Sequence, residues 1–200
     1  MGRPPVFDLD DLAAAGLAVV AADGWEGVSV RAVAGRLRVS PMALYRVVPD
    51  AAGLRRAVAD AAARPLLPPV AAGDLAATLV RWAEAAYAHL GALPGLAAHV
   101  LVTWTELPAW LDVVEALLAR AAAAGVTGAD GVAAVNAVFA YVLARAQLRD
   151  GLAGTARRLA PVAADPGRYP HVAAEVGEFT TARTTRHFRY GLQALTAGLP

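Results

Sequence analysis

Residues 29–48 constrain the fold of this chain most strongly, because they predict two short helices joined by a tight turn. Ser29 can cap a first helix, since a serine oxygen at this position accepts a hydrogen bond from an unpaired backbone N–H. Ser40 can cap a second helix, and Pro41 suits its first position because proline has no N–H to leave unpaired. The first helix has apolar residues at spacings of three and four, namely Val30, Val33, Ala34 and Leu37. This pattern predicts a helix-turn-helix unit.

Charge is concentrated around these two helices, although the whole chain has a net charge of only +1. Residues 29–58 contain six basic residues and one acid, Asp50, whereas residues 8–26 contain five acids and no base. The basic residues are Arg31, Arg36, Arg38, Arg46, Arg55 and Arg56. A positive field focused on one helix is typical of DNA-binding proteins. The alternative is a solvated arginine-rich face with no ligand.

The segments on both sides extend the pattern. A helix predicted over residues 9–23, with Asp8 as its cap, ends at Gly24, and a helix predicted over 51–63 follows Asp50. This first third of the chain resembles the DNA-binding region of the tetracycline-repressor (TetR) family. The resemblance rests on the spacing Gly24…Ser29-x-Arg31-x-x-Ala34…Val39-Ser40-x-x-x-Leu44-Tyr45.

The resemblance implies that the second helix enters the major groove of double-stranded DNA, with its first residues at the base edges. Those residues are Ser40, Pro41, Met42 and Ala43, followed one turn later by Arg46. Only Arg46 in this set can donate two hydrogen bonds to a guanine. The other expected contacts are Arg31 to a base or a phosphate, Ser29, Tyr45 and Arg55 to phosphates, and Arg3 to a neighbouring groove.

Three positions depart from the family pattern. Arg38 replaces the usual glycine of the turn, where a positive φ would cost about 1 kcal/mol. Val47 and Val48 replace an aromatic or histidine pair, and residues 50–52 lack the lysine common at the start of the next helix. These changes predict weaker DNA binding without a change of fold.

The remaining sequence predicts an all-α protein of about nine helices. Hydrophobic residues make up 58% of the chain, isoleucine is absent, and alanine and leucine, the strongest helix formers, are abundant. Beyond residue 64 we expect helices over 75–90, after Pro94-Gly95, and over 108–124, 129–150 and 171–196, with a long loop at 151–170. The prolines that follow Arg64 place a domain boundary there, giving a helix-turn-helix domain at 1–64 and a ligand-binding and dimerisation domain at 65–200.

The TetR resemblance implies that the helices near 129–150 and 171–196 pair with a second copy in a homodimer. Both are apolar on more than one side, which also fits burial within one subunit. Residues 85–105 are uncharged and long enough to span a membrane, but Gly91, Pro94 and Gly95 interrupt them, so we expect no membrane contact.

The same resemblance implies a pocket for a small, mostly apolar effector among the helices between 75 and 150. The expected lining residues are Trp82, Tyr87, His89, Trp104, Trp110, Asn136, Phe139 and Tyr141. Aromatic residues at helical spacing also fit an ordinary core. Asn136 lies in an apolar run, which predicts a buried amide that bonds either a neighbouring helix or a ligand.

Other functional classes have little support in the sequence. Cysteine is absent, which excludes disulfides and cysteine metal sites and fits a cytoplasmic protein. The four histidines lack metal-type spacing, and no phosphate loop or nucleophile elbow is present, so we expect neither an enzyme nor a cofactor. The TetR resemblance therefore implies a transcriptional regulator, a repressor released from a palindromic operator by its effector. The alternative is a helical small-molecule-binding or protein-interaction module with a weakened DNA-binding domain.

Overall fold

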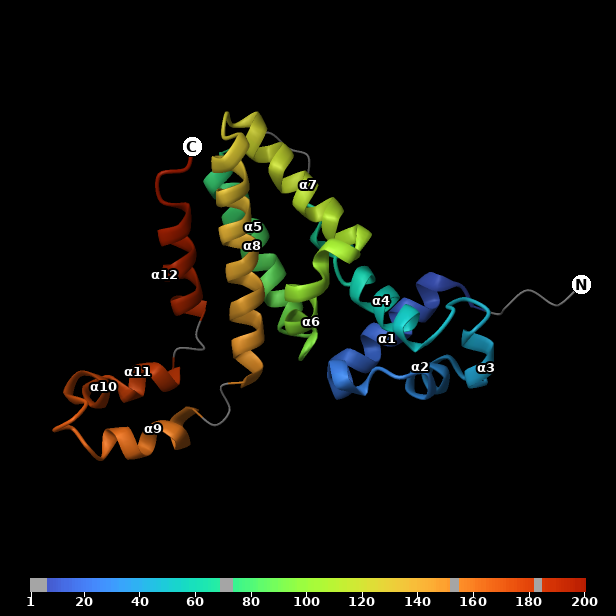
Figure 1. The fold of residues 1–200 in the computed structure, drawn as a ribbon, viewed down its shortest axis with the longest axis horizontal. Coiled ribbons are helices and arrows are strands. Elements are labelled where there is room, and N and C mark those ends of the chain that lie inside the picture. Colours follow the sequence, from blue (N-terminus) through green and yellow to red (C-terminus); the bar gives the residue numbers. More distant parts are fainter. Residues whose placement is uncertain (1–6, 69–73, 152–154, 182–184) are drawn as a thin grey trace, which may run out of the picture.

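The computed structural model describes residues 7–68, 74–151, 155–181 and 185–200. Throughout these ranges the regular elements are helices, which confirms the all-α prediction (Figure 1). The first helices form a unit at one end of the molecule, and α8 (Gly128–Gly151) runs through the centre of the remainder (Figure 1).

The N-terminal unit begins with α1 (Leu9–Asp23) and a short 3₁₀ turn, η1 (Trp25–Gly27). The helix-turn-helix follows as α2 (Val30–Leu37) and α3 (Pro41–Leu44). α4 (Ala51–Ala61) packs across α1, and η2 (Arg64–Leu66) leads out of the unit. The helices start close to the predicted residues because the predicted caps form at the starts of α1, α2 and α4.

Ser40 is the exception among the predicted caps. It has the extended backbone of an N-cap, but its hydroxyl makes no capping hydrogen bond, and α3 ends after four residues. Arg46 therefore lies in the turn that follows α3 and not inside a longer reading helix.

The second unit packs four helices around α8. These are α5 (Leu75–Leu90), α6 (Leu96–Thr103), α7 (Pro108–Ala123) and α12 (Thr185–Thr196), with the turn η3 (Trp104–Glu106) between α6 and α7. The buried face of α8 consists of Val135, Val138, Phe139, Val142, Leu143 and Ala146. By length and composition, residues 128–149 of α8 could cross a membrane, and their apolar character is explained here by packing against these four helices.

The C-terminal region differs from the prediction. Residues 155–163 form a helix, α9 (Thr155–Ala163), where a loop was expected. The expected single helix over 171–196 is wrong, because the chain forms α10 (Pro170–Ala174), turns at Glu175 and continues as α11 (Val176–Thr181). These three short helices pack on one another beyond the end of α8 (Figure 1).

The physical reason lies in the apolar pattern. Around the described turn, Glu175, Gly177 and Glu178 interrupt the apolar pattern, so 171–196 has no continuous apolar stripe that a neighbouring helix could cover. In the described part of this segment, α12 has a buried face, formed by Phe188, Leu192 and Thr196. Of the helix expected over 171–196, the part that can pair with a second copy as one helix is therefore α12, residues 185–196.

Candidate nucleic-acid interface

The turn between α2 and α3 is closed by backbone hydrogen bonds. The Arg38 N–H donates to the carbonyls of Ala34 and Gly35, and the Val39 N–H donates to Ala34 at 3.0 Å. Arg38 itself has φ 56° and ψ 41°, a left-handed conformation that costs roughly 1–2 kcal/mol for a residue with a side chain. The positive φ expected at this position is therefore present.

The predicted reading residues lie on the surface around α3. Ser40, Pro41, Tyr45 and Arg46 are exposed, and Ala43 is half-buried. Met42 is 72% exposed, which is unusual for a large apolar side chain. Leu44 is fully buried and anchors the helix from beneath. The short helix thus presents Met42 to solvent, and the turn after it presents one phenol and one guanidinium.

Four arginines around the turn are free to meet an anion. Arg31, Arg36, Arg38 and Arg46 are exposed, and none forms an ion pair with any residue in the described ranges. The nearby carboxylate of Asp50 accepts the Gly53 N–H at 2.7 Å and caps α4. The positive field predicted from the sequence therefore stands at the surface without a neutralising partner.

Arg55 occupies a different environment from the other arginines. Its guanidinium lies 4.5 Å from the ring centre of Trp25, donates to the Val28 carbonyl at 3.3 Å and lies 3.7 Å from Glu26. These contacts direct Arg55 toward η1, so its predicted phosphate contact requires it to leave them. Arg3 lies outside the described residues.

The end of α4 is bound by side chains of the second unit. The indole N–H of Trp110 donates to the Ala59 carbonyl at 2.8 Å, and that of Trp82 donates to Leu66 at 3.0 Å. His89 Nε2 lies 3.0 Å from the Ala62 carbonyl, and Asp60 accepts the Ala109 N–H at 2.7 Å. Trp82, His89 and Trp110 were predicted to line a ligand pocket. The polar atoms of His89 and Trp110 connect the two units, and that of Trp82 bonds the segment between them at Leu66.

A second joint connects η1 with α6. The ring centres of Trp25 and His99 lie 4.6 Å apart, and the backbone N–H of Trp25 donates to the Pro94 carbonyl at 2.8 Å. Burial lowers the pKa of His99, and the positive charge of Arg55 lowers it further. The neutral imidazole is therefore the form that the folded protein favours. This joint could not be predicted from the sequence, since a single tryptophan and a single histidine have no distinctive spacing.

Three of the predicted ligand residues meet at one cavity of about 190 Å³ between α7 and α8. Trp104 packs edge-on against Phe139 with ring centres 5.4 Å apart. Asn136 lies at this cavity but is exposed, so the prediction of a buried amide was wrong. The sequence-based prediction omitted the aliphatic lining residues Val114, Leu118, Val132 and Val135, which look like any other core residues.

Tyr87 and Tyr141 lie elsewhere and support α12. Both rings stack on Phe188, at 4.1 and 5.5 Å between ring centres. The Tyr141 hydroxyl donates to the Phe188 carbonyl at 3.1 Å, and burial raises the pKa of this phenol. These two residues are separated from the cavity that contains Trp104.

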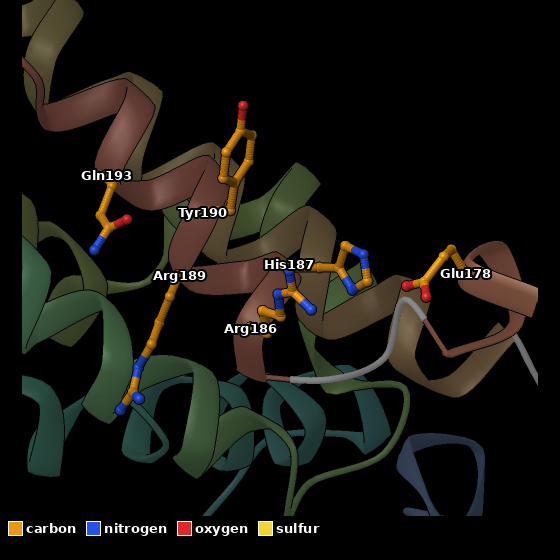
Figure 2. A pocket seen from close by; sticks show the side chains of 6 residues that line it. All are labelled: Glu178, Arg186, His187, Arg189, Tyr190 and Gln193. Carbon is orange, nitrogen blue, oxygen red and sulfur yellow. The ribbon is translucent and has the colours of Figure 1, made fainter. Parts of the chain in front are cut away.

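The outer face of α12 is open and carries both polar and apolar side chains. Figure 2 shows Tyr190 and Gln193 on this helix, with Arg189 directed toward α5, where it pairs with Glu84 at 2.6 Å. A shallow hollow of about 620 Å³ lies along this face. Tyr190 is 77% exposed, so a large part of the phenol is available to another surface.

Comparison with known proteins identifies the chain's relatives. A family model described as the tetracyclin repressor-like C-terminal domain matches residues 67–200. The chain belongs to the TetR family. It is 31% identical over 214 residues to the HTH-type transcriptional repressor DrrR1 of Streptomyces coeruleorubidus, covering 99% of this chain and 79% of DrrR1.

Solved TetR-family structures share the fold. Apo ActR of Streptomyces coelicolor has a TM-score of 0.82 at 20% identity, covering 98% of this chain and 96% of ActR. BioQ of Mycobacterium smegmatis has a TM-score of 0.70 at 25% identity, covering 96% and 97%. ActR has also been solved with actinorhodin and with (S)-DNPA, and BioQ with its natural double-stranded DNA operator.

The departures from the TetR pattern have clear structural outcomes. Val48 is 4% exposed and belongs to the core, so it is not available to DNA as an aromatic residue at the surface would be. The start of α4 presents Asp50 and two alanines, with no cation in these three positions. At these positions the chain therefore lacks the exposed aromatic side chain and the lysine of the family pattern.

Proposed function

We propose that this TetR-family chain is a repressor that binds a palindromic operator in double-stranded DNA and is released by a small, mostly apolar effector. The observation that carries the proposal is the set of four exposed, unpaired arginines around α2 and α3. The relative DrrR1 is named a repressor, and BioQ has been solved with its operator. In this proposal residues 1–64 bind DNA, and residues 65–200 bind the effector and form the dimer.

The test is an electrophoretic shift assay with duplex DNA that flanks the chain's own gene. The expected result is a discrete complex that competitor DNA of unrelated sequence does not remove and that weakens steeply as salt rises. Retention that is independent of sequence and salt would argue against the proposal.

The dimer surface proposed here combines the open faces of α8 and α12. Leu148 on α8 is 49% exposed, and Tyr190 and Leu195 on α12 are 77% and 39% exposed. Large apolar side chains on adjacent helices favour burial against a partner. A second copy is the proposed partner, because a palindromic operator requires a two-fold symmetric protein.

The proposed effector site is the cavity beside Trp104 and Phe139. Its volume of about 190 Å³ is comparable to an engineered cavity of about 150 Å³ that binds benzene, so a compact aromatic group fits without rearrangement. Asn136 at the rim can give one hydrogen bond to a polar substituent. ActR, with the same fold, has been solved with actinorhodin and with (S)-DNPA, which supports a small-molecule effector.

A second candidate function is a helical small-molecule-binding or protein-interaction module whose DNA contacts are weakened. The absence of a cation at residues 50–52 favours it. An effector that binds the chain while no DNA fragment does would support this module.

For the repressor, a cytoplasmic location and a non-catalytic role follow from its proposed action on DNA.

A further inference from the structure

Arg38 has an unusual backbone conformation for its residue type. Within the described ranges it is the only residue other than glycine with positive φ. The other positions with positive φ are Gly24, Gly95, Gly125, Gly128 and Gly198. The chain therefore uses glycine wherever the backbone is left-handed, except in the turn of the helix-turn-helix.

Nothing in the described part of the protein compensates for this strain. The Arg38 side chain is exposed, and its guanidinium has no hydrogen bond or ion pair with a described residue. Its backbone N–H closes the turn through Ala34 and Gly35, but a glycine would donate the same bonds. The side chain thus contributes to no contact that holds the fold.

The position of Arg38 suggests what it does contact. It precedes Ser40, the N-cap of α3, by two residues, so their Cα atoms are at most about 7 Å apart. The N-terminal end of a reading helix enters a major groove about 12 Å wide, and phosphates line both edges of that groove. A long cationic side chain beside the helix start can reach one of these edges.

We propose that Arg38 is a phosphate-binding residue of this chain, retained in a strained conformation because its guanidinium contacts the DNA backbone next to α3. This inference rests on the proposed DNA-binding function. It also explains how binding persists although residues 50–52 supply no cation. Backbone strain at a binding surface fits a functional contact, since a position whose side chain had no function would favour glycine.

The experiment compares Arg38→Gly with Arg38→Lys in the full chain, using duplex DNA that flanks its gene. For Arg38→Gly we expect the melting temperature to rise by about 2–4 °C, because the strain is relieved. The slope of log affinity against log salt should fall by about 0.9 for each bound protomer, because one phosphate contact is lost. Arg38→Lys should keep the wild-type slope.

Arg157→Ala is the matched control. It removes one exposed arginine from α9, on the far side of the molecule from α2 and α3, and should leave the slope unchanged (Figure 1). An Arg38→Gly slope equal to that of the wild type overturns the inference and leaves the proposed function intact. A wild-type chain that binds no DNA in a salt-dependent manner overturns the proposed function itself.

Discussion

At the scale of single residues, the surface around α3 divides into one group that can read bases and several that can hold phosphates. Arg46 is the exposed guanidinium just beyond α3, and Tyr45 beside it presents a phenol. A guanidinium can recognise guanine through two hydrogen bonds, whereas a phenol on a phosphate senses no sequence. Specificity in this chain therefore depends on very few side chains.

This division predicts different effects for two substitutions. Arg46→Ala should reduce discrimination at one base pair by about 1–3 kcal/mol. Tyr45→Phe should weaken binding to every duplex alike, by about 1.5–3 kcal/mol for the lost hydrogen bond to a phosphate. Affinities for the operator and for single-base variants of it measure both effects. Parallel losses for the two substitutions would contradict the assigned roles.

The two serines of the helix-turn-helix provide a matched pair for stability. Ser29 accepts the Ala32 N–H at 3.2 Å, whereas Ser40 makes no capping bond. Ser29→Ala should lower the free energy of unfolding by about 0.5–2 kcal/mol. Ser40→Ala should change it by less than about 0.5 kcal/mol. Urea denaturation of both variants measures the difference, and equal losses would show that the Ser29 cap is not stabilising.

At the scale of elements, the joint between α4 and α7 is the firmest connection between the two units. Trp110 is fully buried, and its N–H is bonded to the Ala59 carbonyl. Trp110→Phe should lower the free energy of unfolding by about 1–3 kcal/mol in addition to the effect of the smaller side chain, because it leaves a buried carbonyl unpaired. Trp104→Phe is the control, since the Trp104 indole donates to no described residue. Thermal unfolding of the two variants should show a clearly larger loss for Trp110→Phe, and equal losses would contradict this assignment.

The joint between η1 and α6 predicts a pH dependence. The pKa of His99 is lowered in the folded state, while in the unfolded chain it is about 6.5. The unfolded chain therefore binds a proton first as the pH falls, and stability decreases from about pH 6.5 down to the folded pKa. His99→Phe keeps an aromatic ring against Trp25 and should flatten this decrease in urea titrations between pH 7.5 and 5.5. An unchanged decrease would assign the effect to other groups.

Sequence reasoning succeeded for elements whose ends carry their own signals. Asp8, Ser29 and Asp50 each accept the backbone bond expected of a cap, and the corresponding helices begin where predicted. It failed over residues 155–181, where short helices pack on one another and Pro161 lies inside α9. The cavity was predicted only in part, because its aliphatic lining has no pattern that separates it from the core.

At the scale of the whole molecule, the remaining surface to explain is the open face of α8 and α12. Tyr190→Glu should convert the proposed dimer to a monomer without unfolding it, because this side chain is 77% exposed within the protomer. Leu111→Glu is the control, since Leu111 is exposed on α7, away from this face. Sedimentation equilibrium measures both, and a Tyr190→Glu chain that remains dimeric would exclude this face as the interface.

The central claim is that the arginines around α2 and α3 bind a palindromic operator. Footprinting of the full chain on duplex DNA flanking its gene, at salt from 50 to 200 mM, tests it most directly. We predict two protected half-sites about 34–36 Å apart, with protection that falls steeply as salt rises. Uniform protection along the DNA, or none at the lowest salt, would contradict the claim.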